Sequence, residues 1–389
     1  MNILFLCNKS PWPPKEGGPM AMNMLIEGIS DAGHQVKVLA VNTFKYNIRL
    51  ADIPTSYKDK TGIELIDVDL RIKPHFAFLH LFTGKSYHVE RFISEKFRKR
   101  LTELLITNAF DIVQLETVFM CPYIGTIRKY SRARIVLRAH NIEHHIWERI
   151  ASETKNHLKK WYLSHLAKKL KSYEERVIQT TDGILAITPA DAEYFLENLP
   201  KPEGHSIPVM DIPFGADPAI YSNLPGTVEF PSLFSLGSMN WIPNQDGIRW
   251  FLTNVWPDVH NQFPELKYYL AGREMPTWMR SLNLPNVEVL GEVEDAGVFL
   301  RSKAIMIVPL FSGGGIRVKI IEGMAAGKTI ISTTIGAAGI RYTHRENILI
   351  ADIQYKCLAR FSGLCLTKRA GGVGIRSRAK CRRNIRRTR

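Results

Sequence analysis

The sequence has no long hydrophobic run, few cysteines and no acidic residue in its last 35 positions. No stretch approaches the roughly 18 apolar residues that a membrane-spanning helix needs. Residues 1–7 lack the basic segment and the long apolar core of a signal peptide, and they predict a first β-strand instead. We therefore expect a cytoplasmic protein that either stays in solution or attaches peripherally to the inner face of the membrane.

Only five cysteines occur in 389 residues, and no pair of them has the spacing of a metal site or a redox motif. Cys7 and Cys121 lie in the body of the chain, and the other three lie near its end. Such sparse cysteines fit a reducing cytosol and exclude a small fold held by disulfides. The hydrophobic content of 45% is that of a globular protein, and the length suits two domains.

The formal net charge of +15 is concentrated at one end of the chain. Residues 355–389 contain three Lys and nine Arg, a charge of +12, whereas residues 1–354 contain 40 basic and 37 acidic residues. One interpretation of this glycine-rich, aperiodic segment is an arm that binds RNA or a membrane. We favour a reading-frame shift near Gln354, because the composition changes abruptly there. A specific nucleic-acid partner is therefore not expected.

Strands and helices alternate along the first part of the chain. A strand over 3–7, a glycine-containing loop, a helix and a strand over 36–41 predict a right-handed crossover unit of a parallel sheet. Further alternation predicts one helix over 89–107 and one long helical stretch over about 146–179, with Leu158 and Leu166 in its buried seam. This part of the chain is typical of a Rossmann-like domain.

A second alternation of strands and helices follows a turn-rich break at Leu224-Pro225-Gly226. We predict an α/β fold with two Rossmann-like domains, residues 1–224 and 225–354, whose parallel sheets face a cleft. Residues 355–389 are not expected to form a domain. Ligands of such proteins bind at the carboxyl ends of the strands, so the loops just after strands are the candidate sites.

A glycine-rich loop after the predicted strand at 305–308 opens directly into a helix. Glycines let the backbone approach a ligand, free N–H groups at a helix start suit a phosphate, and a carboxylate can accept from vicinal hydroxyls. The candidate residues of this site, which suits the phosphates and ribose of a nucleotide, are Gly313, Gly314, Gly315, Arg317, Lys319 and Glu322. The alternative is a loop that only turns the chain. The Walker pattern is excluded, because no Gly-Lys-Ser/Thr follows the glycines.

Four segments together resemble the retaining, nucleotide-sugar-dependent glycosyltransferases of the glycogen-synthase-like group, family 4. The segments are Gly17-Gly18 with residues 33–36, residues 213–217, residues 237–244 and residues 313–327. The resemblance implies the two-Rossmann GT-B architecture, with the first domain on the acceptor side and the second on the donor side. It also implies a hexosyltransferase-like enzyme that uses a nucleotide diphosphate sugar as substrate and needs no cofactor.

The sequence departs from this family at two points. Many members have two glutamates eight residues apart; Glu322 matches the second, which contacts the donor ribose, and Gly314 occupies the position of the first. A subgroup of bacterial polysaccharide transferases resembles this glycine-rich form. The basic pair that usually follows the first strand of the second domain is replaced by residues 240–244. Phosphate charge would then fall on Arg317 and Lys319, helped by Arg273.

Two further sites follow strands in the first domain. His140 comes just after a predicted strand at 133–137, and the resemblance implies that it contacts the transferred sugar or the acceptor. A purely structural histidine is the alternative. Gly17 and Gly18 follow the first strand, where the resemblance implies a loop facing the donor phosphates and the acceptor. The alternative is a turn into the first helix.

Two patterns suggest metal sites that we do not expect. His140, Glu143 and His144 spell the His-x-x-Glu-His motif of inverted zinc proteases, but the first histidine ends a strand and no third ligand stands out. Asp67 and Asp69 lie two apart in an alternating segment, so both face solvent. With no metal, the helix start and the basic residues must neutralise the leaving diphosphate.

The sequence thus predicts a glycosyltransferase that transfers a sugar with retention to a hydroxyl of a saccharide or lipid-linked acceptor, in bacterial cell-surface polysaccharide assembly. Lysines along the helix at 146–179 form either a solvated face or a contact with an anionic membrane. Three alternative functions remain. A dehydrogenase would need a glycine-rich turn after the first strand, which this sequence lacks. The others are a nucleotide-sugar epimerase of the same fold and an inactive remnant whose tail binds nucleic acid. A frameshifted tail would impair this copy by removing the final helices.

Overall fold

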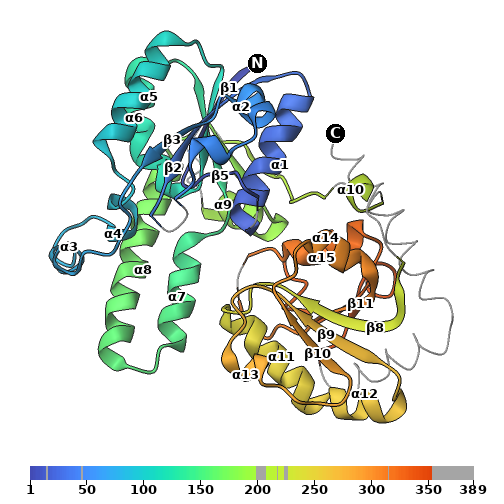
Figure 1. Ribbon diagram of the computed structural model, residues 1–389. Coiled ribbons are helices and arrows are strands. Elements are labelled where there is room, and N and C mark those ends of the chain that lie inside the picture. Colours follow the sequence, from blue (N-terminus) through green and yellow to red (C-terminus); the bar gives the residue numbers. More distant parts are fainter. Residues whose placement is uncertain are drawn as a thin grey trace. The chain divides into compact units, whose positions relative to one another are not determined.

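The computed structural model describes residues 1–352 except 15, 45–46, 199–206, 217, 223–226 and 314. The chain divides into two compact units, residues 1–213 and 214–389 (Figure 1). Helix α10 (Pro218–Ser222) belongs to the second unit, because Arg301 donates hydrogen bonds to the carbonyl oxygens of Tyr221, at 2.8 Å, and Ser222. The expected break at 224–226 and the basic tail lie outside the described residues.

The N-terminal unit contains a sheet of seven parallel strands in the order β3-β2-β1-β4-β5-β6-β7. The strands are β1 (Asn2–Cys7), β2 (Gln35–Asn42), β3 (Glu64–Asp67), β4 (Ile112–Glu116), β5 (Arg134–Ala139), β6 (Gly183–Ala186) and β7 (Val209–Asp211). The strand order reverses direction between β1 and β4. Sheets of this kind bind ligands beyond the carboxyl ends of the strands at such a point.

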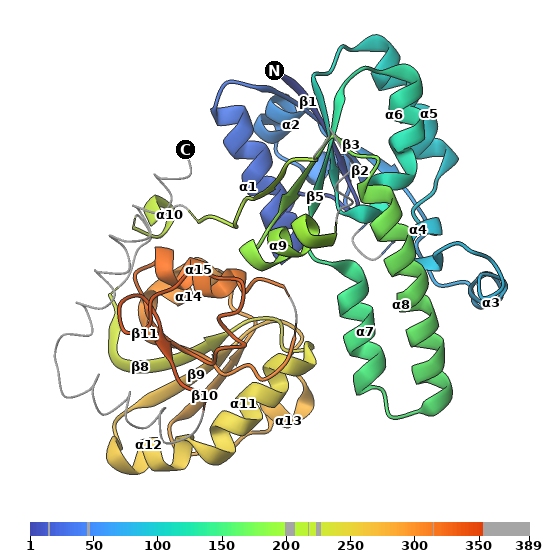
Figure 2. The ribbon, with the colours of Figure 1, turned by 180° about the vertical axis from the view of Figure 1, so that it is seen from behind.

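Alternating apolar residues place helices on both faces of this sheet (Figures 1 and 2). In β1, Phe5 packs with residues of α1 and α2, whereas Leu4 and Leu6 pack with residues of α5 and α6. Successive side chains of a strand point to opposite faces, which explains the two cores. The helices are α1 (Gly17–Asp31), α2 (Thr55–Thr61), α3 (Pro74–Leu79), α4 (Tyr87–Glu90), α5 (Glu95–Thr107), α6 (Ile124–Tyr130) and α9 (Pro189–Asn198), with 3₁₀ turns at Leu50–Asp52 and Val118–Tyr123.

Two helical predictions were wrong in their extent. The segment predicted as one helix over 89–107 is α4 followed by α5, and Ser94 caps α5 by accepting a hydrogen bond from the backbone N–H of Phe97. The long stretch is α7 (Glu143–Glu153) and α8 (His157–Ile178), which form an antiparallel hairpin (Figure 1). Helix α7 ends at Glu153, and Asn156 caps the start of α8, because its side chain accepts from the N–H of Lys159.

The structure also corrects the predicted buried face of this helical stretch. Leu166 is buried as expected, but Leu158 is 81% exposed. Leu158 lies in the first turn of α8, beside the turn of the hairpin, and its side chain faces solvent. An apolar side chain at helical spacing was assigned to the core, and it lies on the surface instead.

The C-terminal unit contains a second, six-stranded parallel sheet in the order β10-β9-β8-β11-β12-β13. The strands are β8 (Glu229–Leu236), β9 (Lys267–Ala271), β10 (Val287–Gly291), β11 (Lys303–Val308), β12 (Thr329–Ser332) and β13 (Leu349–Ile350). The helices are α11 (Ile242–Asn254), α12 (Trp256–Gln262), α13 (Thr277–Arg280), α14 (Ala296–Ser302) and α15 (Val318–Ala325). Leu233 of β8 packs with residues of α11 and α12, and Phe234 packs with residues of α14 and α15. The predicted α/β fold with two parallel sheets is confirmed.

Candidate active-site residues

A buried charge network lies at the carboxyl ends of β4 and β5. Glu116 pairs in register with Arg138, so both side chains lie on the same face of the sheet. Glu116 Oε2 lies 2.6 Å from His140 Nε2 and 3.5 Å from Arg138 Nη1, and Gln114 Nε2 donates to Glu116 Oε1 at 2.5 Å. Glu116 is fully buried and Arg138 is 2% exposed.

The network defines which nitrogen of His140 carries a proton. Burial favours the neutral form of Glu116, but Arg138 and His140 outweigh it and hold the pKa of this carboxyl below its ordinary value. Burial also lowers the pKa of His140, against the opposing effect of Glu116. A carboxylate only accepts hydrogen bonds, so the neutral His140 donates through Nε2. Nδ1 then presents a lone pair that can accept a hydrogen bond from a hydroxyl.

Arg138 connects this network to the first helix. Its Nη1 donates to the backbone carbonyl of Ala21 in α1 at 2.8 Å. Thr117, the residue after β4, adopts φ 77°, a conformation that a β-branched residue rarely takes. Its N–H donates to the carbonyl oxygen of Arg138 at 3.0 Å. Backbone strain of this kind persists where the surrounding structure holds it, and it is common at functional sites.

Gly17 and Gly18 are the first two residues of α1. A Cβ at Gly18 would lie 3.1 Å from Cε of Lys9, so glycine lets this lysine lie close to the start of the helix. Lys9 pairs with Glu16 at 3.7 Å, and its charge lowers the pKa of His140. The structure therefore brings the loop after β1 and the segment after β5 together, as their positions after strands suggested.

The residues of the zinc-protease pattern do not converge on one point. Glu174 of α8 accepts from the N–H of His144 at 3.3 Å and lies 2.7 Å from its Nδ1, while the hydroxyl of Tyr194 lies 3.2 Å from Nε2. Both ring nitrogens of His144 are thus engaged, and His140 bonds to Glu116 instead. Glu174 also accepts from the N–H of Glu143, so it caps α7.

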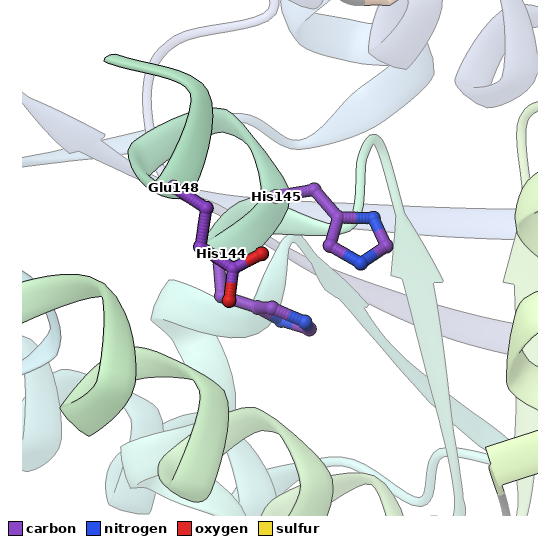
Figure 3. A group of neighbouring side chains, drawn as sticks. All are labelled: His144, His145 and Glu148. Carbon is purple, nitrogen blue, oxygen red and sulfur yellow. The ribbon is translucent and has the colours of Figure 1, made fainter. Parts of the chain in front are cut away.

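A different group of three possible metal ligands lies at the start of α7. The ligand atoms of His144, His145 and Glu148 lie within 4.8 Å of one another (Figure 3). Within the described ranges this is the one such group. His144 would have to give up a hydrogen bond to Glu174 or Tyr194 to bind an ion there. Asp67 and Asp69 are exposed, as expected, and Asp69 pairs with Arg71 at 2.8 Å.

The glycine loop of the C-terminal unit requires its glycines. Gly313 has φ 106°, and a Cβ there would lie 2.7 Å from the ring of Trp241. Gly315 has φ 78°, which also favours glycine. The guanidinium of Arg317 lies over the Trp241 ring, 5.0 Å from its centroid, and donates to the carbonyl of Gly315 at 2.6 Å. The predicted site residue Gly314 lies outside the described residues.

Lys319, in the first turn of α15, is positioned by Asn244 in the first turn of α11. Its ammonium donates to Asn244 Oδ1 at 2.9 Å. Burial, with a contribution from Arg317, lowers the pKa of Lys319 to about 7. A Cβ at Gly237 would lie 3.4 Å from the same ammonium nitrogen, so the end of β8 also approaches it. Arg317 and Lys319 therefore place two basic groups beside a helix N-terminus.

Glu322 lies one turn further along α15. Its Oε1 accepts a hydrogen bond from the hydroxyl of Tyr221 at 3.1 Å. Burial raises the pKa of Glu322, and the Tyr221 hydroxyl opposes that rise. Arg273 follows β9, and its backbone carbonyl accepts from the N–H of Met239 at 2.8 Å, which joins the loops after β8 and β9. The predicted donor residues that the structure describes therefore lie in the loop after β11, at the start of α15 and in the loop after β9.

Several residues of these sites were not predicted from the sequence, among them Glu116, Arg138, Asn244 and Tyr221. Gln114 and Glu116 did give a signal, since two polar residues at alternate positions of a buried strand are unusual and need partners. Asn244 ends one segment of the resemblance, residues 237–244, but no role was predicted for its side chain. Tyr221 gave none, because nothing local links it to Glu322, 101 residues away.

Two sequence families match the chain. Residues 17–209 match Glycosyltransferase Family 4, and residues 231–360 match Glycosyl transferases group 1. A curated relative is an uncharacterized 44.6 kDa protein in the cps region of Klebsiella pneumoniae, 22% identical over 361 residues, which cover 90% of this chain and 87% of the relative. Within the described residues, no helix is both long and apolar enough to cross a bilayer.

Solved structures with the same fold cover nearly the whole chain. Sucrose-phosphate synthase from Thermosynechococcus elongatus superposes with a TM-score of 0.67 at 15% identity, covering 98% of this chain and 94% of that chain. Anabaena HepE in complex with UDP superposes with a TM-score of 0.60 at 12% identity and the same coverage. These likenesses identify the GT-B fold, as predicted.

Proposed function

We propose that this chain, which carries the two domains of a GT-B glycosyltransferase, transfers a sugar from a nucleotide diphosphate donor to a hydroxyl acceptor with retention of anomeric configuration. The acceptor is a saccharide or a lipid-linked saccharide. The relative in a cps region and the complex of HepE with UDP support a role in polysaccharide assembly and a nucleotide donor, respectively.

The observation that carries this proposal is the environment of Lys319. Its hydrogen-bond partner, Asn244, is neutral, and the charged group that affects its pKa is another cation, Arg317. Burial makes such an ammonium costly unless an anion compensates it. A diphosphate at the start of α15 would supply that anion, with the helix N–H groups as further donors. Glu322, one turn further on, can accept from the hydroxyls of the ribose.

In the proposed reaction the bond between the anomeric carbon and the phosphate oxygen breaks, and the nucleotide diphosphate leaves with the bonding electrons. The acceptor oxygen bonds to the same face of the anomeric carbon, and its proton passes to the leaving phosphate oxygen. Arg317, Lys319 and the start of α15 stabilise the leaving charge, so the proposal needs no metal. Nδ1 of His140 accepts a hydrogen bond from a sugar hydroxyl and orients it.

The hairpin supports the proposal that the protein attaches to a membrane. Trp161 is 62% exposed and lies three residues after the exposed Leu158, so both lie on one face of α8. The Trp161 ring stacks on His165, the next residue along that face, with centroids 5.9 Å apart. Residues 154–173 contain six lysines and no Asp or Glu. Exposed apolar side chains among lysines are typical of an anionic membrane contact.

A second segment extends this surface. Lys169 donates to the carbonyl oxygens of His80, Leu81 and Thr83, at 2.9 Å in the case of Leu81, and so holds that loop against α8. Phe82 in the loop is 78% exposed, and residues 70–89 contain no Asp or Glu. We call Leu158, Trp161, Phe82 and the lysines around them the hairpin surface.

The test is binding and turnover with a panel of nucleotide diphosphate sugars. Glu322→Ala and Arg317→Ala should weaken binding of the nucleotide. Product analysis should find the sugar attached to the acceptor, at an unchanged rate when a metal chelator is present. Unchanged binding of every nucleoside diphosphate by both variants would overturn the site assignment. A sugar altered without any acceptor would indicate an epimerase instead.

A further inference from the structure

A pocket of about 370 Å³ lies in the N-terminal unit beyond the ends of β1, β2 and β3. Asn8 and Lys9 follow β1 directly, Thr43 follows β2 directly, and Arg71 comes shortly after β3. Arg91, from the turn after α4, completes the polar part of its wall. All of the residues that line the pocket belong to the N-terminal unit, whereas the proposed donor residues on α15 belong to the other unit.

The charged residues that line the pocket are all cationic. Arg71 is paired with Asp69, and Lys9 lies 3.7 Å from Glu16. Arg91 differs from both, since within the described residues it has no carboxylate within ion-pair distance. Its Nη1 donates to the carbonyl of Leu70 at 2.9 Å, and its guanidinium lies 5.6 Å from the Tyr87 ring centroid. These contacts hold the guanidinium in place without neutralising it, so the pocket is suited to an anion.

Three buried polar atoms of this wall have no hydrogen-bond partner among the described residues. They are Asn8 Oδ1, Thr43 Oγ1 and Arg91 Nε. Buried polar atoms are nearly always hydrogen-bonded, so three around one cavity point to a ligand that satisfies them. The two oxygens can accept from hydroxyl groups, whereas Nε–H can only donate, as to a carboxylate or phosphate oxygen. A ligand that carries both hydroxyls and an anionic oxygen would satisfy all three atoms.

The rest of the wall suits a sugar ring. Phe44 and Phe92 line the pocket, and the guanidinium of Arg71 lies 5.7 Å from the Phe44 ring centroid. Apolar walls with a few placed polar groups are the usual form of a small-molecule site. Lys9 also lies against the start of α1, since a Cβ at Gly18 would lie 3.1 Å from its Cε, and Arg138 bonds to Ala21 of the same helix. The pocket and the network that holds His140 therefore both adjoin α1.

We propose that this pocket binds an anionic saccharide, and that this saccharide is the acceptor. The assignment as acceptor rests on the proposed transfer reaction, whereas the binding itself does not. The anion is a carboxylate, as in a uronic acid, or a phosphate on the sugar, since both offer the same acceptor oxygens to Arg91.

The test is a ligand-observed NMR titration of the full chain with methyl glucuronide, glucose 6-phosphate and uncharged methyl glucoside. Either anionic sugar should bind at least about tenfold more tightly than methyl glucoside, because a charge-assisted hydrogen bond is worth at least that factor. The tighter of the two identifies the anion. Arg91→Met should remove this preference, while Arg98→Met, a matched change on α5, should leave it intact. Thr43→Val should weaken the binding of all three sugars several-fold.

Binding of UDP is measured on every variant, because it reports the donor site and the folding of the chain separately. Normal UDP binding with equal affinity for all three sugars would overturn the pocket assignment and leave the proposed transfer standing. Loss of anionic-sugar binding upon addition of UDP would place the anion at the donor site and also overturn it. If the preference for anionic sugars survives both Arg91→Met and Thr43→Val, the anionic sugar binds at another basic region, such as the C-terminal segment.

Discussion

His140 Nε2 lies 2.6 Å from Glu116 Oε2, and the geometry makes the buried glutamate the partner that orients the histidine. Glu116 is a positioning residue in this arrangement, since it acts through His140. Histidines in other active sites are often held by a carboxylate in the same way, and the carboxylate then selects the tautomer of the ring. This relationship leads to the first prediction.

Glu116→Gln should lower kcat by about ten- to a hundredfold with little effect on UDP affinity. A glutamine can donate to Nε2 of His140, which would move the histidine proton to Nδ1 and remove the acceptor from the sugar side. The measurement is a kinetic double-mutant cycle with His140→Ala. Glu116→Gln should have no further effect on kcat in the His140→Ala background. Additive losses would mean that Glu116 does not act through His140.

UDP affinity should fall as the pH rises above about 7, because Lys319 loses its proton there in the free protein. A bound diphosphate favours the charged lysine and raises its pKa, so binding at about pH 8 should take up a proton, and the affinity should fall at most tenfold per pH unit. Isothermal titration in two buffers of different ionisation enthalpy measures this uptake. Lys319→Met should bind UDP more weakly and without proton uptake. An uptake that persists in this variant would contradict the assignment.

The same lysine affects stability without ligand. Its pKa is about 7 in the folded chain and has the ordinary value of 10.5 in the unfolded chain. Between these values the unfolded chain binds more protons, so the contribution of Lys319 makes the protein more stable as the pH rises through this window. Subtracting the pH dependence of the Lys319→Met unfolding free energy from that of the parent isolates this contribution.

Glu174→Ala should lower the free energy of unfolding by about 2–4 kcal/mol. The buried carboxylate caps α7 and accepts from His144, so its removal leaves several buried donors without an acceptor. Urea unfolding measures the change. Glu175→Ala is the matched control, since that side chain forms a weak surface pair with Lys171 at 3.9 Å and should change stability by less than about 1 kcal/mol. Equal effects of the two changes would refute the capping role.

The double variant Leu158→Ser with Trp161→Ser should bind vesicles containing phosphatidylglycerol roughly tenfold more weakly than the parent. Both side chains are exposed, so the change should leave the melting temperature unaltered. Co-sedimentation measures binding, with phosphatidylcholine vesicles as the neutral comparison. Ile106→Ser, an exposed apolar position on α5, is the control and should bind normally. If the double variant also binds normally, the contact lies elsewhere, for example in the basic C-terminal segment.

Local patterns predicted much of this fold. Alternation of strand and helix, with glycines after strands, was enough for two parallel α/β units and for the glycine loop around Gly313. Pairing across distance was not accessible in the same way. Glu116 meets His140 through the register of β4 and β5, and Lys319 meets Asn244 across 75 residues. Such contacts follow from the assembled sheets, which no single segment specifies.

The hairpin shows where a periodic pattern is ambiguous. Leu158 and Leu166 fall at the same helical spacing, and spacing alone cannot say where the covering helix ends. The chain reverses at residues 154–156, between α7 and α8, so Leu158 lies beside the turn of the hairpin, where its side chain is exposed. A capping residue inside a long helical stretch was the available signal.

Arg138 gives the site a further property through its bond to Ala21 in α1. The same guanidinium keeps Glu116 ionised and links α1 to the sheet. Replacing Arg138 would therefore alter the reactivity of the site and destabilise the domain at the same time. Variant libraries aimed at new sugar specificity should therefore keep position 138 fixed. The library should instead vary residues such as Phe44, whose exposed side chain can be replaced without disturbing the packing of the domain.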